Sequence, residues 1–166
     1  MGKKEEGRQS QGAIGRAMSG EARVWQRYVR ERYNTRLRRR LGNVDLAGLI
    51  ATQSEIELIK YRLVRDEDFR VDDPIVVYKG RTGTTYIVDG HTRARVRWDA
   101  DEKSIWAVML SCPEMDVDLE LARNAECAGD GGPIHVGDIP IVDRVGEGTE
   151  KWEQRRREIL RDSESP

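Results

Sequence analysis

The amino-acid sequence predicts a small α+β domain, and three observations support this fold class. Three short apolar segments have the length and composition of β-strands, at residues 73–78, 84–88 and 104–110. The first two follow each other closely enough to form a hairpin. Around the strands, apolar residues recur at three- and four-residue spacing, which is typical of amphipathic helices. At 166 residues the chain has room for one domain with extensions.

The N-terminal part of the chain is basic. Residues 1–19 are rich in glycine, serine, glutamine and charge, which predicts a flexible segment. A basic amphipathic helix is expected from 20 to 42, ending at Gly42 and Asn43. Its apolar face would carry Val24, Trp25, Tyr28, Val29, Tyr33, Leu37 and Leu41. Its other faces carry arginines, among them Arg27, Arg30, Arg36, Arg38, Arg39 and Arg40.

Charge is distributed unevenly although the net charge is only −1. Residues 1–40 hold twelve Lys and Arg against four Glu, whereas residues 101–150 hold three against twelve Asp and Glu. The arginines either cover a surface helix in contact with solvent or face an anionic partner: DNA or RNA phosphates, or the acidic half of a second copy. No zinc spacing or aromatic RNA motif accompanies them. We therefore expect contact with a backbone rather than reading of bases.

A short motif joins the strand at 84–88 to a helix that runs to about Trp98. It reads Asp89-Gly90-His91-Thr92-Arg93. The free N–H groups of the helix start, the helix dipole and the Arg93 guanidinium together predict a phosphate site. Gly90 allows a sharp turn and a close approach of the phosphate to the backbone. The alternative is a common Asp-Gly turn that only connects two elements.

In this context, the run from Val88 to Arg93 resembles the signature of the ParB/sulfiredoxin fold superfamily. The resemblance covers residues 43–110 and includes the order of elements: a strand and polar turn at 49–55 that opens a helix, then the strand at 73–78, the hairpin, the motif and the strand at 104–110. It implies a small mixed sheet surrounded by helices, with the core at 43–112.

Differences within the superfamily narrow the expected chemistry. Sulfiredoxins place a catalytic cysteine just before His-Arg, whereas Cys112 and Cys127 lie well downstream here, so sulfinic acid reduction is not expected. Chromosome-partition ParB proteins grip CTP with a Gly-Glu-Arg-Arg loop and carry a second motif that residues 121–126 match only faintly. The loop is closer to the branch that includes archaeal free-serine kinases, which reads Asp-Gly-His-His-Arg; Thr92 stands at the second histidine.

The resemblance implies a nucleotide, ATP, ADP or CTP, bound with Mg²⁺. Its phosphates would be held by Gly90, His91, Thr92 and Arg93. Asp89 would hold Mg²⁺ or orient the acceptor hydroxyl, and His91 would act beside it in catalysis. Ser54 is expected to cap a helix with Glu55 and Glu57 in its first turn and a buried edge at Ile56, Ile59 and Leu63. Glu55, with Glu57 in reserve, would be the catalytic base; alternatively, both glutamates only complement the helix dipole.

The C-terminal third is predicted to extend the core. Residues 113–147 are expected to form a helix at 116–126, a turn at 129–133 and an extended segment at 134–142, and His135 receives no role. Residues 148–166 would form a helix at 150–161 and a tail, docked on a neighbour or on the N-terminal helix.

Two function hypotheses follow, with a third in which only the fold is kept. The first is a nucleotide-dependent kinase or NTPase that transfers a phosphoryl group to a small hydroxyl substrate or to water. The second is a nucleotide-gated DNA-binding, partition-type or assembly protein that uses the arginine-rich helix, with a homo-oligomer as one form. Two cysteines and the lack of a hydrophobic leader or long apolar run indicate a cytoplasmic protein without a membrane partner.

Overall fold

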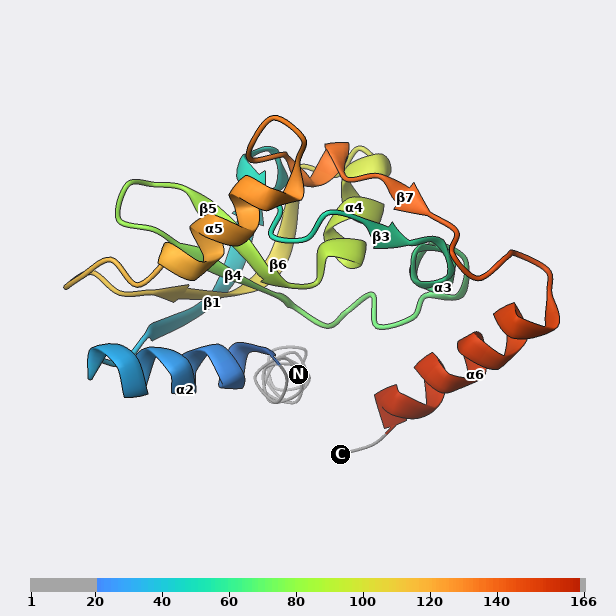
Figure 1. The fold of residues 1–166 in the computed structure, drawn as a ribbon, viewed down its shortest axis with the longest axis horizontal. Helices are drawn as coiled ribbons and strands as arrows, with labels where there is room; N and C mark the ends of the chain where they lie inside the picture. The colour runs from blue at the N-terminus through green and yellow to red at the C-terminus, as the bar shows by residue number, and fades with distance from the viewer. Residues whose placement is uncertain (1–20, 165–166) are drawn as a thin grey trace, which may run out of the picture.

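The computed structural model describes residues 21–164. The flexible segment predicted at 1–19 lies outside the described residues. Figure 1 shows a central sheet with α2 at one side and α6 at the far end of the molecule. The fold is α+β, as predicted. None of the helices within 21–164 has the length and apolar character that a membrane crossing requires.

The central sheet has five strands in the order β1-β6-β4-β5-β2. β1 and β6 are antiparallel, β6 and β4 parallel, β4 and β5 an antiparallel hairpin, and β5 and β2 parallel. The strands span Arg38–Asp45 (β1), Leu49–Ile50 (β2), Ile75–Lys79 (β4), Thr85–Asp89 (β5) and Ser104–Ser111 (β6). The strands predicted at 73–78, 84–88 and 104–110 are therefore confirmed, and so is the hairpin.

Both faces of the sheet are buried, which explains the continuous apolar run in β4. Val76 and Tyr78 point into a core cluster that also receives Trp25 and Val29 from α2 (Glu21–Tyr33). Ile75 belongs, with Val77, to a second cluster on the opposite face. Successive side chains of a strand point to opposite faces, so a strand covered on both sides needs apolar residues at every position.

The predicted helix from 20 to 42 is wrong beyond Tyr33. α2 ends there, Asn34 adopts a left-handed conformation with φ 52°, and the chain enters β1 at Arg38. Residues four apart lie on one side of a helix but also on one face of a strand, so the spacing of Leu37 and Leu41 fits both. Residues 38–45 form a strand because all eight pair with residues of β6. Arg27 and Arg30 thus lie on α2, Arg36 lies in the connection, and Arg38, Arg39 and Arg40 lie on β1.

The helix that Ser54 was expected to cap begins later. Ile56–Glu57 forms strand β3, paired in parallel with β7 (Ile141–Val142), and α3 spans Leu58–Glu67. Its N-cap residue is Glu57, without a side-chain cap hydrogen bond. A backbone partner 85 positions downstream, Ile141 opposite Ile56, competes successfully with the local cap signal. All three residues of the predicted buried edge are buried, but only Ile59 and Leu63 lie on the helix, whereas Ile56 lies on β3.

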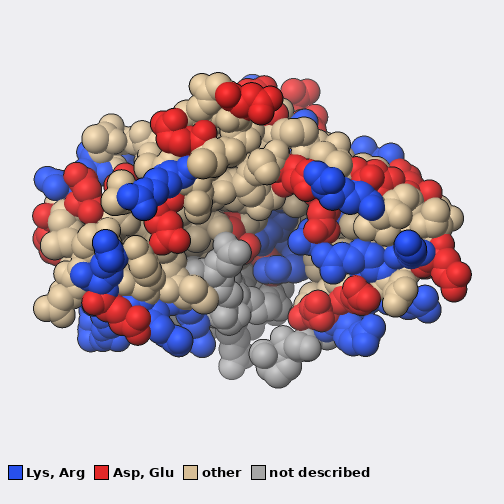
Figure 2. Space-filling view, viewed as in Figure 1, with Lys and Arg blue, Asp and Glu red and all other residues tan. Residues whose placement is uncertain are grey.

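The C-terminal elements are α5 (Leu119–Ala128), a 3₁₀ turn at Val136–Asp138, β7 and α6 (Glu150–Glu164). α6 packs on α3 rather than on α2: Trp152 and Ile159 share a cluster with Ile59 and Leu63. Figure 2 shows charges of both signs interspersed over this end of the molecule. Three ion pairs reinforce the contact: Arg155–Glu57, Arg156–Glu67 and Arg62–Glu147.

His135 has a structural role. Its Nε2 lies 2.7 Å from the Leu46 carbonyl oxygen, and its Nδ1 accepts the Gly137 N–H at 2.9 Å. The ring also meets Trp98 of α4 (His91–Asp99) edge-on, with centroids 4.5 Å apart. The histidine therefore ties the 134–142 segment to the core, and nothing in these contacts points to chemistry.

Candidate functional site

The motif forms the predicted strand–turn–helix joint. β5 ends at Asp89, Gly90 adopts φ 104° and ψ 26°, and α4 begins at His91. A Cβ at position 90 would lie 2.5 Å from Ile75 Cγ2, so both the backbone conformation and the packing require glycine. The structure thus explains Gly90 independently of any ligand.

The N-terminus of α4 is left open. The Ala94 N–H donates to the Gly90 carbonyl at 3.0 Å and makes the first bond of the helix. The N–H groups of His91, Thr92 and Arg93 precede that bond. Within residues 21–164 no side chain caps this terminus, and its first turn carries no acidic residue. Such a helix start attracts an anion through its N–H groups and the positive end of the dipole.

His91 is turned into the protein. The residue is 5% exposed, and Nε2 accepts the Thr52 N–H at 3.0 Å. The Thr52 hydroxyl in turn donates to the Ile87 carbonyl at 2.6 Å. Burial lowers the pKa of His91 to about 4, so the ring is neutral at pH 7. Through these contacts His91 links α4 to the turn after β2. Its Nε2 already accepts a hydrogen bond from Thr52.

Arg93 is also engaged by its own chain. The residue is 5% exposed, and Nη1 donates to the carbonyl oxygens of Asp73 and Pro74 at 2.8 and 3.2 Å. Nη2 lies 3.4 Å from Asp89 Oδ2. The guanidinium expected to clamp a phosphate therefore satisfies the backbone that leads into β4. Arg93 also borders a cavity at the start of α4, but few of its N–H donors are free to bind a ligand.

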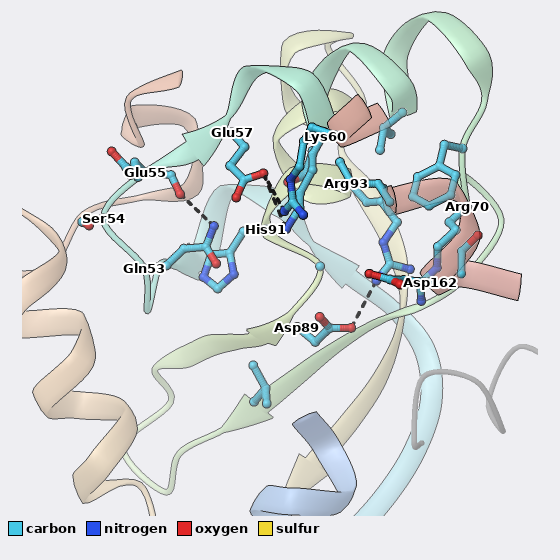
Figure 3. A pocket seen from close by; sticks show the side chains of 18 residues that line it. Gln53, Ser54, Glu55, Glu57, Lys60, Arg70, Asp89, His91, Arg93 and Asp162 are labelled. Atoms are coloured by element: carbon cyan, nitrogen blue, oxygen red, sulfur yellow. Dashed lines mark hydrogen bonds and ion pairs between the residues drawn. The ribbon is translucent and has the colours of Figure 1, made fainter. Parts of the chain in front are cut away.

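A cavity of about 550 Å³ opens at the start of α4, between this helix, α3 and α6. Figure 3 shows His91 and Asp89 at the cavity, Glu57 and Lys60 across from them, and Arg93 beside Arg70 and Asp162. The volume lies within the range typical of ligand sites, about 300–1,000 Å³. The protein's own side chains therefore leave room for an external ligand beside the motif.

Three cations at this cavity were missed by sequence reasoning. Lys60 comes from α3, Arg70 from the loop after it and Arg155 from α6. Lys60 Nζ lies 4.0 Å and Arg155 Nη2 3.3 Å from the same carboxylate oxygen of Glu57, Oε2. Arg70 pairs with Asp73 at 2.7 Å. Spacing along α3 could have placed Lys60 beside Glu57, but no local signal brings α6 to this site.

The predicted acidic residues occupy different settings. Glu55 lines the cavity, yet both of its oxygens accept hydrogen bonds from Arg144 at 2.7 Å, and this contact lowers the pKa of Glu55. The Glu57 carboxylate instead faces Lys60 and Arg155. The Asp89 side chain is 36% exposed at the cavity wall. The structure therefore brings Glu55, Asp89 and the motif to one cavity, with Glu55 held at its edge by Arg144.

Metal ligands are sparse. Over residues 21–164 no three His, Cys, Asp or Glu side chains gather in a way that could hold a metal ion. Asp89 offers a single accessible carboxylate, which suits Mg²⁺ only if phosphate oxygens and water complete the coordination. Cys112 and Cys127 are free thiols, and Cys112 is buried in the core.

The arginines singled out in the sequence lie elsewhere. Arg27, Arg30 and Arg36 line a second hollow of about 390 Å³, together with Arg23, Gln26 and Leu37. Arg38, Arg39 and Arg40 follow on the exposed part of β1. The two hollows share no lining residue.

Comparison with known proteins finds two solved structures of low similarity. No family model matches the chain, and no curated protein matches it. The structure is similar to that of protein Atu1540 from Agrobacterium tumefaciens, with TM-score 0.41 and 19% identity over 64% of this chain and 63% of that one. It is also similar to a Pnob8-like ParB-N domain, with TM-score 0.29 and 13% identity over 57% of this chain and 37% of that domain. This chain thus spans less than two thirds of either structure.

Proposed function

We propose that the cavity at the start of α4 binds a nucleotide through its phosphates. One observation carries this proposal: an uncapped helix N-terminus, entered through a left-handed glycine, opens into a cavity of about 550 Å³ bordered by Lys60, Arg70 and Arg155. The free N–H groups would donate hydrogen bonds to phosphate oxygens, and the cations would neutralise the charge of the phosphates.

The ion pairs around the cavity support an anionic ligand. Lys60 and Arg155 both pair with the carboxylate of Glu57, and Arg155 also lies 3.7 Å from Glu158. An incoming phosphate can take either cation without leaving Glu57 unpaired. Lys60 offers a point charge on a flexible stem and Arg155 a planar fork, and both are common partners of phosphate. We therefore assign the clamping role to these residues and to Arg70, with Arg93 shaping the wall behind them.

The proposed chemistry is phosphoryl transfer to a small hydroxyl substrate, or hydrolysis. Mg²⁺, held by Asp89 together with the phosphates, would supply charge neutralisation. Glu55 remains the predicted base because it lines the cavity. The ion pair with Arg144 lowers the pKa of Glu55 and so weakens it as a base, and Arg144 would have to release the carboxylate for it to take a proton. Catalysis of this kind depends mainly on positioning and on electrostatic stabilisation of the phosphates. ATP, ADP and CTP are the candidate nucleotides.

Lys60→Gln is expected to weaken nucleotide binding by about 10- to 100-fold, the loss typical of one charge-assisted hydrogen bond. Isothermal calorimetry with ATP, ADP and CTP in the presence of Mg²⁺ measures the effect. Lys79→Gln provides the matched control, because Lys79 is exposed on β4 and does not line the cavity. Equal affinity in wild type and Lys60→Gln would remove Lys60 from the site, and no heat with any of the three nucleotides would refute the proposal.

Glu55→Gln is expected to preserve nucleotide binding and to abolish turnover, because the amide cannot take a proton. The assay supplies nucleotide, Mg²⁺ and free serine as the hydroxyl substrate, and detects phosphoserine and inorganic phosphate. Glu57→Gln is assayed in parallel. Turnover lost only in Glu57→Gln would transfer the role of base to Glu57, and full turnover in both variants would exclude both residues.

The alternative function, a nucleotide-gated DNA-binding or assembly protein, would use the same cavity as a switch. It differs in the fate of the nucleotide, which such a protein binds without needing to transfer its phosphoryl group. Nucleotide binding without any phosphorylated product in the preceding assay would favour this alternative.

A further inference from the structure

The arginine surface is a second feature of the molecule, and the nucleotide site does not explain it. It consists of Arg23, Arg27, Arg30, Arg36, Arg38, Arg39 and Arg40, on α2, the following connection and β1. Residues 21–40 contain eight arginines and two glutamates, in a chain of net charge −1. Positive charge is thus concentrated in one part of the fold, and Figure 2 shows Lys and Arg side chains along the lower left, where α2 lies in Figure 1.

The geometry of α2 gathers part of this charge on one side. Arg23, Arg27 and Arg30 follow one another at four- and three-residue spacing and so lie on one side of the helix. Trp25 and Val29, on the other side, are buried against the sheet. Arg36 approaches from the connection, so four arginines border one hollow of about 390 Å³.

Within residues 21–164, these arginines lack the carboxylate partners that most other arginines have. Among residues 21–164, none of the seven forms an ion pair with a carboxylate, whereas most other arginines there do: Arg62, Arg65, Arg70, Arg81, Arg93, Arg95, Arg97, Arg144, Arg155 and Arg156. Charge on an edge strand discourages pairing between sheets, which can explain Arg38, Arg39 and Arg40 on β1. It does not explain the four arginines of the hollow.

We propose that the arginine surface binds the phosphate backbone of duplex DNA without reading its sequence. A 13-residue helix is roughly 20 Å long, and duplex DNA presents about one phosphate charge per 1.7 Å of its axis, so several guanidinium groups can meet phosphates at once. Single strands are the weaker match, because proteins that bind them stack bases on aromatic side chains and the hollow has none in its lining.

A second copy of the chain is the less favoured partner. Its acidic segment, 101–150, already uses several carboxylates internally. Glu102 pairs with Arg97, and Glu147 pairs with Arg62. Asp143 accepts three backbone N–H groups, from Val145, Gly146 and Glu147. The remaining acidic side chains offer the arginine surface less charge than a duplex does.

Fluorescence anisotropy with a labelled mixed-sequence DNA duplex, at several NaCl concentrations, tests the proposal. The full chain should bind with an affinity that falls steeply with salt. The triple variant Arg27→Gln, Arg30→Gln, Arg36→Gln should lose about tenfold or more in affinity, and its log–log salt slope should be smaller by about 0.9 for each lost phosphate contact. The control is Arg123→Gln, Arg157→Gln, Arg161→Gln, which removes the same charge from exposed residues elsewhere and should bind like wild type.

Three outcomes would overturn the proposal. One is no binding of the duplex by the full chain at low salt. Another is an equal loss in both triple variants, which would mean that only net charge matters. The third is a surface variant with unchanged DNA affinity but an altered sedimentation coefficient, which would make the surface an interface between copies. If the first triple variant unfolds, Arg38→Gln, Arg39→Gln, Arg40→Gln replaces it. The assay contains no nucleotide, so its result is independent of the cavity at α4.

Discussion

Arg93→Ala is expected to destabilise the whole fold by about 3–5 kcal/mol, the range seen when one partner of a buried charged contact is removed. The change leaves the carbonyl oxygens of Asp73 and Pro74 without their donor and takes the cation away from Asp89. Both carbonyls belong to the segment that leads into the central strand β4, so the loss reaches the core. A motif residue that the sequence assigns to ligand binding is thus expected to act first on stability.

Denaturant unfolding of Arg93→Ala measures this effect. Arg97→Ala, one turn further along α4, is the matched control: Arg97 also donates to a backbone carbonyl, that of Val71, but its side chain is 35% exposed and its loss should cost much less. Arg93→Lys keeps the charge but not the paired donors, and should fall between alanine and wild type. If Arg93→Ala had normal stability and had lost only nucleotide binding, the Arg93 guanidinium would instead be assigned to phosphate binding.

His91 is expected to make the protein lose stability as the pH falls from about 6.5 to 4. Burial lowers the pKa of His91 in the folded protein to about 4 from the ordinary value of 6.5. The unfolded chain therefore takes up a proton at a pH where the folded protein does not. The contribution of His91 is complete above pH 6.5 and is lost as the pH falls to 4, in all by about 3 kcal/mol.

Urea unfolding of wild type and His91→Gln across this pH range tests the expectation. The Gln side-chain oxygen can still accept the Thr52 N–H but does not titrate, so the difference in stability between the two proteins should shrink as the pH falls. Carboxylates titrate in both proteins and cancel from the comparison. His135→Gln should keep the pH dependence of wild type. Parallel curves for wild type and His91→Gln would show that His91 is not held neutral by the fold.

Local patterns were sufficient for the segment from 73 to 111. A proline-led apolar run, a hairpin, an Asp-Gly turn and a helix follow one another, and each depends on neighbours within a few residues. Gly90 is needed there for backbone conformation and for contact with Ile75, within the same hairpin and turn. Each of these signals can be recognised within a few consecutive residues. These elements and their bounds were therefore predicted closely.

Elements whose partners are remote were predicted less well. β1 pairs with β6, with Arg38 opposite Ser111, and β3 pairs with β7. The periodicity near Leu37 and Leu41 fits a helix and a strand alike, and Ser54 is an ordinary cap signal that the β3–β7 pairing overrides. Backbone hydrogen bonds to distant strands do not leave a mark in the local sequence, so these two errors have one cause.

From its residues alone, this chain specified the strand, the glycine turn and the helix that carry the candidate site. The packing of distant segments settled which side chains face the cavity. His91 and Arg93 are buried because the Thr52 turn and the 73–74 segment close over them. Arg155 joins Lys60 and Arg70 at the cavity because α6 packs on α3. Side-chain exposure depends on neighbours that folding brings together, whereas a turn depends on the backbone preferences of a few consecutive residues.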